Sequence, residues 1–431
     1  MARKKRQTSN SAPPERSLSN RLIMLISAGT AALYFFSNPK FQTYYDYTFR
    51  VAENLLHGSV GFAEKPPAWL NEFVPVDGYW YSVFPFGAVV SMLPFAALKP
   101  IGMITQMPSA VIAALCSGAS CLFMLLIARH YAVTRDRAIL MTVGILFGTW
   151  TWTNLTFGGA WQLALGFALV GELGATYFTL VNKRRLIAGV FFALAFGNRT
   201  EILLTAPIFL YWLWNKAEPA SDGELQKPDR NGGLKQNGFS YALIDVRASA
   251  LFCAAPFILG VSTLIYNFVR FGSIADFGYA RIPGVLNEPW YDHGIFSVYY
   301  IPRQIWEMLF KLWEWRPSFP LPMPNPFSSS VLLSSPFLLF AFRPGARDMA
   351  TKYLCWIAVL AICIPLWMHG NSGGWQFGYR YAIAILPFIF VIMLENAPKK
   401  ITALEWAAYA FSFIVNAYAT WLFHWSDHLK P

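Results

Sequence analysis

The sequence predicts an all-α, polytopic membrane protein with about eleven transmembrane helices. Hydrophobic residues make up 55% of the 431 residues and charged residues only 13%, about half the charged fraction of an ordinary soluble domain. The apolar residues are gathered into runs close to the roughly 20 residues that cross a bilayer. Basic residues lie between these runs, so the net charge of +11 indicates membrane topology and predicts no nucleic-acid partner.

Eleven apolar runs are candidate spans, several of them short for a hydrocarbon core of about 30 Å. A further run at 83–98 contains Pro85, Gly87 and Pro94, and a proline inside a helix removes a hydrogen bond and kinks it. We expect this run to form an interfacial or re-entrant helix. The eleven spans are 20–36, 109–128, 138–157, 162–181, 186–197, 202–214, 248–268, 329–342, 353–369, 381–395 and 402–423.

The positive charges predict the orientation. With the N-terminus in the cytoplasm and 83–98 left uncounted, 22 of the 34 Lys and Arg residues fall on the inner side, as the positive-inside rule requires. Counting 83–98 as a full span would move the basic turns 129–137 and 183–185 outside. The predicted topology therefore places the N-terminus inside and the C-terminus outside.

One transmembrane domain is expected at 21–431, after a disordered cytoplasmic tail at 1–20 that is polar, basic and rich in Ser and Pro. The large outer loops are 37–108, the first, and 270–328, the fourth. Each is expected to carry interfacial helices. The polar inner segment 215–247 is interpreted as a flexible linker.

Within the fourth outer loop, the stretch 299–315 has the pattern of an amphipathic helix lying in the interface. The five cysteines all lie in apolar runs, which argues against a disulfide framework or a zinc site.

The first outer loop opens with a predicted amphipathic helix. Phe49, Ala52, Leu55 and Leu56 recur at helical spacing, and Gly58 would close the helix. The opposite face carries the charged and polar side chains Asp46, Arg50, Glu53 and His57. A carboxylate directly after a membrane span is placed to deprotonate a hydroxyl acceptor, which makes Asp46 the candidate base. A solvated face with local ion pairs is the alternative.

Two further groups of residues are functional candidates. Arg199 and Glu201 lie between two short spans, so both would sit below the outer surface, where ionisable groups are functional candidates. The alternative is that Arg199 and Glu201 pair only with each other, in the helical hairpin formed by the two short spans, and have no functional role. Arg380 follows Gln376 and Tyr379 in a glycine-rich segment, where a guanidinium could grip a phosphate with two hydrogen bonds.

Aromatic residues follow the Asp77-Gly78 pair, which predicts a turn. Tyr81 belongs to this aromatic run and could contact a sugar or an acceptor, although anchoring at the interface is the simpler interpretation.

At this point the layout resembles the GT-C membrane glycosyltransferases, which include the protein O-mannosyltransferases and the lipid A aminoarabinose transferase. The matching features are a short first span, a long first outer loop and an acidic residue at Asp46. More locally, the chain is similar to a bacterial subgroup of such enzymes. The segments that carry this similarity are Tyr79–Gly87, Tyr266–Ser273 and Gln376–Arg380.

The resemblance implies transfer of a sugar from a polyprenyl-phosphate donor, with inversion, to a lipid, glycan or protein acceptor on the outer face. Asp46 would be the base, and Arg199 and Arg380 would hold the phosphate. Family members often have a second carboxylate directly after the first, and this chain has Tyr47 there. We therefore expect no metal site and no cofactor. A divalent cation that takes part in the reaction is the open alternative. The substrate contacts expected beside the two arginines are Glu53, Tyr81, Gln376, Tyr379, Glu201 and Arg281.

The resemblance also implies a multi-pass protein of the bacterial inner membrane, within the cell envelope, whose active site faces the periplasm or exterior. A transporter or flippase of a polyprenyl-linked or other lipid is the competing hypothesis. It would use charges within the membrane and broken helices, and Glu172 together with the short runs in 186–214 fits it.

Overall fold

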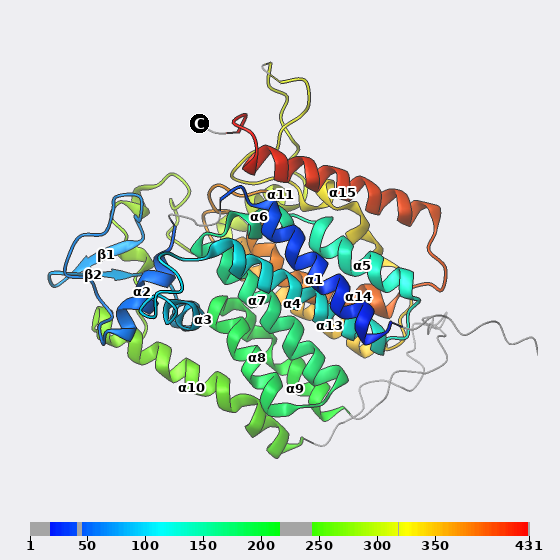
Figure 1. Ribbon diagram of the computed structural model, residues 1–431, viewed down its shortest axis with the longest axis horizontal. Coiled ribbons are helices and arrows are strands. Elements are labelled where there is room, and N and C mark those ends of the chain that lie inside the picture. Colours follow the sequence, from blue (N-terminus) through cyan, green and yellow to red (C-terminus); the bar gives the residue numbers. More distant parts are fainter. Residues whose placement is uncertain (1–17, 41–44, 216–243, 318, 430–431) are drawn as a thin grey trace, which may run out of the picture.

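The computed structural model describes residues 18–40, 45–215, 244–317 and 319–429 (Figure 1). Within them the chain is mostly helical, with one two-stranded antiparallel hairpin. Residues 1–17 of the predicted tail and 216–243 of the predicted linker lie outside the described residues.

The main α-helices are α1 (Asn20–Ser37), α2 (Tyr47–Leu56), α3 (Phe86–Ala96), α4 (Ser109–His130), α5 (Arg135–Phe147), α6 (Thr151–Phe157), α7 (Ala160–Thr176), α8 (Arg185–Asn198), α9 (Ala206–Trp214), α10 (Val246–Phe271), α11 (Ile301–Leu309), α12 (Val331–Ser334), α13 (Met349–Met368), α14 (Leu386–Glu395) and α15 (Ala403–His424). Short helical turns extend several of them, among them η1 (Tyr177–Val181), η2 (Thr200–Thr205), η5 (Val298–Tyr300), η6 (Pro336–Phe342) and η7 (Arg380–Ile385).

Every run predicted as a span contains helix, but the number of eleven transmembrane helices is not confirmed. Four described helices are long and apolar enough to cross a membrane: α4, α7 continued through η1, α10 and α13. The pair α5 and α6 makes a fifth if it is counted as one span, although it is bent by 50°. Several of the remaining runs are divided or brief, as where Ser335 separates α12 from η6. Helices α1 and α15 are undivided, with 18 and 22 residues, but are not among the candidate spans.

The helices share two common ends. At one end lie the hairpin and helices α2 and α3, which we call the hairpin end (Figure 1). At the opposite end, the basic turns pair with acidic residues across the chain. Tyr131 donates to Glu395 over 2.8 Å, and Glu405 accepts from Arg137 over 2.6 Å and from Arg343 over 2.8 Å. The predicted inner turns 129–137 and 343–352 therefore contact Glu395, at the end of the predicted span 381–395, and Glu405, near the start of the predicted span 402–423.

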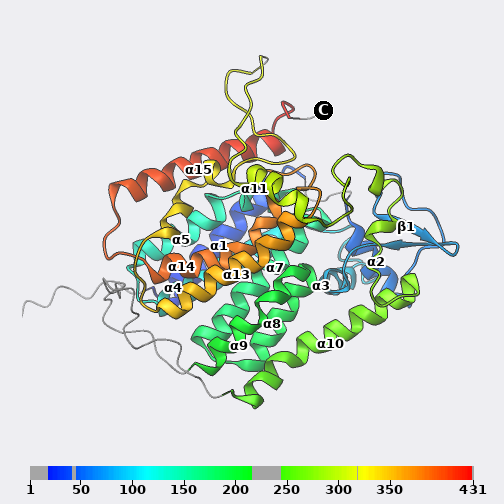
Figure 2. The ribbon, with the colours of Figure 1, turned by 180° about the vertical axis from the view of Figure 1, so that it is seen from behind.

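Small residues let neighbouring helices approach closely, as is common in membrane helix packing. A side chain on Gly171 of α7 would meet the backbone of Ala195 in α8, and one on Gly189 of α8 would meet the backbone of Phe252 in α10. The helices α7, α8 and α10 therefore form a tightly packed series. Both views place α10 at the edge of the bundle (Figure 1, Figure 2), and only 11% of its apolar window is buried.

The hairpin departs from the all-α prediction. Strand β1 (Phe73–Val76) pairs antiparallel with β2 (Tyr79–Ser82), and Phe73 stands opposite Ser82. The Asp77-Gly78 turn between them is confirmed. Both residues have positive φ, 48° and 81°, as the tightest hairpin turns require.

The predicted helix at 299–315 is shorter than expected. Helix α11 ends at Leu309, where the backbone N–H groups of Phe310 and Lys311 both reach the carbonyl of Trp306. The chain then leaves the helix because Glu314 pairs with Met323 as an antiparallel bridge. Within α11 the amphipathic pattern is clear, since Gln304 and Met308 are buried and Trp306 is exposed.

Candidate functional site at the hairpin end

The first outer helix forms as predicted. Phe49 and Ala52 are buried along α2, and Gly58, at φ 80°, follows its end. Asp46 is the residue before the first helical turn, and its carboxylate accepts from Nε of Arg50 at 2.7 Å. Burial raises the pKa of Asp46, and Arg50 opposes the rise. The polar face of α2 therefore carries a local ion pair, as the alternative interpretation predicts. The Asp46 side chain in this pair is only 14% exposed.

Trp161, in the first turn of α7, joins Asp46 to the rest of the site. The neighbours of Asp46 on either side, Tyr45 and Tyr47, pack their rings 5.6 and 5.0 Å from the indole. The backbone N–H of Ala160 also donates to the carbonyl of Tyr45 over 2.9 Å. On its polar side, the indole Nε1 donates to both carboxylate oxygens of Glu72, at 2.9 and 3.1 Å.

Arg380 also lies beside Trp161. Its guanidinium carbon is 5.8 Å from the Trp161 ring and 4.9 Å from the Tyr381 ring. Two of its nitrogens donate to the carbonyl of Gly374 and to the Tyr381 hydroxyl, at 2.8 and 3.0 Å. The third, Nε, is buried and has no hydrogen-bond partner among the described residues. A buried donor of this kind is costly unless a ligand satisfies it.

A second arginine reaches the same aromatic ring. The guanidinium carbon of Arg199 lies 4.5 Å from the centre of the Tyr381 ring. Arg199 also forms an ion pair with Glu201, at 2.6 Å, with side chains that are 20% and 10% exposed. The predicted mutual pair thus exists, and it stands beside Arg380. Two guanidinium groups around one aromatic ring are suited to bind a phosphate.

Two tyrosines and a histidine line the neighbouring surface. The hydroxyls of Tyr279 and Tyr291 lie 3.1 Å apart. Burial raises the pKa of both phenols, and Tyr381 and Glu72 raise both further. His369 packs against both rings, and its Nδ1 donates to the carbonyl of Asn371 over 2.7 Å.

Burial lowers the pKa of His369, which favours the neutral ring, and the carbonyl of Asn371 accepts from its Nδ1. The charges of Arg199 and Arg380 act on this ring in the same direction, which puts His369 within electrostatic reach of both arginines.

These residues form what we call the hairpin-end cluster. Six separate segments of the chain supply its members, which are Glu72, Trp161, Arg199, Glu201, Tyr279, Tyr291, His369, Arg380 and Tyr381. It contains two guanidinium groups and two carboxylates around aromatic walls. Among the described residues, no group of three His, Cys, Asp or Glu side chains is arranged to hold a metal ion.

The other predicted site residues are engaged elsewhere or serve as supports. Gln376 accepts from the backbone N–H of Arg380 at 2.8 Å and donates to the carbonyl of Phe327. Tyr379 is fully buried, and its hydroxyl donates to Gln304 over 2.9 Å. Both hold the segment that presents Arg380.

The remaining three predicted contacts lie around the cluster. Glu53 pairs with Lys99 at 2.6 Å, and Arg281 pairs with Asp276 at 2.7 Å. Tyr81 packs edge-on against Phe271 at 6.2 Å. The structure therefore brings Arg199, Glu201 and Arg380 together and gives Glu53 and Arg281 other partners. The carboxylate of Asp46 pairs with Arg50, and its chain neighbours Tyr45 and Tyr47 contact Trp161.

The most prominent residue that sequence reasoning missed is Glu72. It stands in an irregular segment just before β1, without a periodic pattern or a charged neighbour to mark it. Its environment comes from Trp161, which lies 89 positions further along the chain. Tyr381 was also missed, although it directly follows Arg380.

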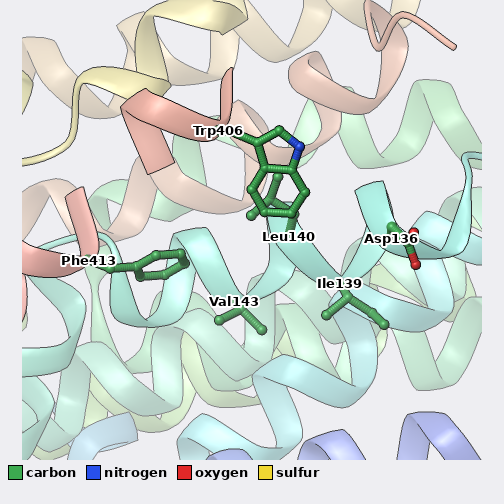
Figure 3. A pocket seen from close by; sticks show the side chains of 6 residues that line it. All are labelled: Asp136, Ile139, Leu140, Val143, Trp406 and Phe413. Carbon is green, nitrogen blue, oxygen red and sulfur yellow. The ribbon is translucent and has the colours of Figure 1, made fainter. Parts of the chain in front are cut away.

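Two other features lie apart from the cluster's core. Glu172 of α7 is fully buried, and neither of its oxygens has a hydrogen-bond partner among the described residues. The second feature is a hollow of about 300 Å³ between α5 and α15 (Figure 3), and it shares no residue with the cluster. Its lining is Asp136, Ile139, Leu140, Val143, Trp406 and Phe413.

Comparison with known proteins gives matches in structure alone. No protein-family profile and no curated protein matches the sequence. The chain is similar to the crystal structure of the apo oligosaccharyltransferase of Archaeoglobus fulgidus, with 12% identity, a TM-score of 0.41, and 93% of this chain covered against 55% of that one.

It is also similar to the archaeal oligosaccharyltransferase AglB of the same organism in complex with an inhibitory peptide and a dolichol-phosphate. There the identity is 13%, the TM-score is 0.39, and the coverage is 93% of this chain and 55% of that one. The chain thus spans about half the length of the solved structures it matches. Likenesses this distant define neither its family nor its reaction.

Proposed function

We propose that this chain is an integral membrane glycosyltransferase of the GT-C type. It would move a sugar from a polyprenyl-phosphate donor to a lipid, glycan or protein acceptor, with inversion at the sugar's anomeric carbon. The observation that carries the proposal is the pair Arg199 and Arg380 around the Tyr381 ring, with carboxylates beside them at one end of an apolar helical bundle.

The two arginines would bind the donor phosphate. A phosphate would supply the acceptor that Nε of Arg380 lacks. It would also meet the Arg199 guanidinium on the same ring. Charge that develops on the phosphate as the sugar leaves would then be stabilised by groups already in place. No reorganisation is needed at the moment of reaction, so the activation barrier is lowered.

Asp46 would be the base that takes the proton from the acceptor hydroxyl. Inversion needs a single in-line attack, so one carboxylate base suffices. Asp46 is largely shielded from water, and the rings of its chain neighbours Tyr45 and Tyr47 pack on Trp161. In-line attack would bring the acceptor to the face of the sugar opposite the phosphate.

The apolar tail of the donor would lie along α10. Its outward side chains include Phe257, Ile258 and Ile265, each more than half exposed. Its last turn meets the hairpin, where Arg270 donates to the carbonyl of Ser82 and Phe271 packs on Tyr81. A tail on this face would bring its phosphate to the hairpin end. We place that end on the outer side of a bacterial inner membrane.

The test is sugar transfer by the purified protein from radiolabelled polyprenyl-phosphate sugars to extracted membrane acceptors. Asp46→Asn is assayed in parallel, with Glu53→Gln as the matched control because Glu53 lies on the same helix face and pairs with Lys99. We expect Asp46→Asn to lose turnover while keeping donor binding, and Glu53→Gln to keep both. Sugar transfer that persists in Asp46→Asn would show that Asp46 is not the base.

A lipid transporter or flippase is the second candidate, and Glu172 is the observation that favours it. A carboxyl group fully buried in a candidate span, without a hydrogen-bond partner among the described residues, is the kind of group that proton-coupled transporters use. Tight binding of polyprenyl phosphate with no transfer from any donor, together with loss of lipid movement in Glu172→Gln, would support this function instead.

A further inference from the structure

Glu72 is the acidic residue of the hairpin-end cluster that the proposed mechanism leaves without a role. The hydrogen bonds from the Trp161 indole hold its carboxylate in one orientation, with 2.9 and 3.1 Å from Nε1 to the two oxygens. Glu72 is half-buried, so a ligand can still reach it.

One charged group and several neutral polar groups surround Glu72. Burial raises its pKa to about 7, whereas Arg380 and the Trp161 hydrogen bond act to lower it. The phenols of Tyr47, Tyr279 and Tyr291 also lie within its electrostatic reach. Burial raises the pKa of each phenol, so none of the three ionises near neutral pH.

Asp46 and Glu72 are both partly buried, but they have different direct partners. Asp46 is bound directly by Arg50, an arginine on its own helix, and that ion pair favours the carboxylate. Glu72 has a neutral indole as its direct partner, and Arg380 acts on it only through space. When environments separate two acids in this way, the harder one to ionise is suited to donate a proton and the other to accept one.

We propose that Glu72 is the proton donor to the departing phosphate, a catalytic role that rests on the glycosyltransferase function proposed above. The acceptor oxygen attacks the anomeric carbon and its proton passes to Asp46. The bond between that carbon and the phosphate oxygen breaks, and the electron pair stays with the oxygen. The carboxylic acid of Glu72 gives its proton to the phosphate and becomes a carboxylate.

The position of Glu72 next to Arg380 supports this assignment. A phosphate bound by Arg380 adds a negative charge near Glu72, and a nearby negative charge favours the protonated acid. Donor binding therefore favours protonation of Glu72, which supplies the proton that the leaving phosphate accepts. The paired phenols Tyr279 and Tyr291 hold their protons too tightly to serve instead, and the Nδ1 proton of His369 is directed at a carbonyl.

The test measures transfer by the full-length protein as a function of pH, for the wild type and for Glu72→Gln. Glutamine keeps an oxygen that can accept from Trp161, so the substitution removes the acid and leaves the hydrogen bond. In the wild type, the rate at saturating donor should fall as the pH rises through about 7 and beyond, because the protonated form is lost. In Glu72→Gln we expect this decline to disappear and kcat at pH 6 to drop by about 10²-fold, at the low end for a positioned proton donor.

Binding separates a proton donor from a merely structural residue. Removing a negative charge near Arg380 should leave the Kd for polyprenyl phosphate unchanged or tighter in Glu72→Gln. A weaker Kd with an unchanged kcat, or a decline with pH identical to that of the wild type, would overturn the proposal. Absence of transfer by the wild type at every pH would instead refute the glycosyltransferase function itself.

A second variant keeps the proposal testable if Glu72→Gln does not fold. Trp161→Phe removes a hydrogen bond that lowers the pKa of Glu72 while keeping an aromatic ring. The decline in rate should then move to higher pH. A decline that stays at the wild-type pH in this variant would also overturn the assignment of Glu72.

Discussion

Replacing Glu405 by Gln tests how the opposite end of the bundle is held together. Glu405 is 2% exposed as a side chain and accepts from Arg137, itself 4% exposed, at 2.6 Å and from Arg343 at 2.8 Å. It also closes a capping box with Thr402 at the start of α15. Glutamine keeps an oxygen for the cap but removes the charge, so Arg137 would remain buried without a counterion.

Removing one partner of a buried ion pair typically costs about 3–5 kcal/mol. Because glutamine still offers a hydrogen-bond acceptor, we expect Glu405→Gln to lower the free energy of unfolding by about 3 kcal/mol, measured by equilibrium denaturation in detergent micelles. The matched control is Asp136→Asn. Its pair with Arg135 is longer, at 3.2 Å, and its side chain is 68% exposed, so the loss should stay below about 0.5 kcal/mol.

Equal losses in the two variants would refute this reasoning, because they would show that the Glu405 charge is no more important than a solvated one. A loss below about 1 kcal/mol for Glu405→Gln would do the same. The transfer rate per folded molecule should be unchanged in both variants, since neither residue belongs to the hairpin-end cluster.

Two further predictions concern the residues around the phosphate site. Arg380→Lys keeps the charge but loses the planar donor set, so the Kd for polyprenyl phosphate should rise by about tenfold or more; binding as tight as in the wild type, measured by calorimetry, would exclude Arg380 from phosphate binding. Tyr379→Phe removes a buried hydroxyl that donates to Gln304, so the free energy of unfolding should fall by about 1–2 kcal/mol with little change in donor affinity; a large loss of affinity without a loss of stability would instead give Tyr379 a direct substrate contact.

The sequence predicts well those features that local periodicity determines. The helix that begins after Asp46, its polar face and its end near Gly58 all follow from spacing within twelve residues, and the structure confirms them. The Asp77-Gly78 turn is confirmed for the same reason, because two residues with positive φ suffice to define it.

Features that depend on distant partners are not recoverable in this way. Glu72 is significant only because Trp161 and Arg380, from two other elements, lie beside it. The helix predicted at 299–315 stops early because Glu314 finds a partner at Met323. The number of spans is not confirmed, and apolar runs such as 329–342 are broken by turns that composition does not reveal.

The charge balance of the hairpin-end cluster connects binding to release under the proposed mechanism. With Glu72 protonated, Arg199 and Arg380 exceed Glu201 by one positive charge, and a donor with one negative phosphate brings the cluster to neutrality. Transfer leaves the acceptor's proton on Asp46 and an additional negative charge shared between the phosphate and Glu72. In a partly buried site an uncompensated charge is costly, so the lipid phosphate is bound less tightly after transfer than before it. The same pair of acids, Asp46 and Glu72, would thus favour both the chemical step and the departure of its product.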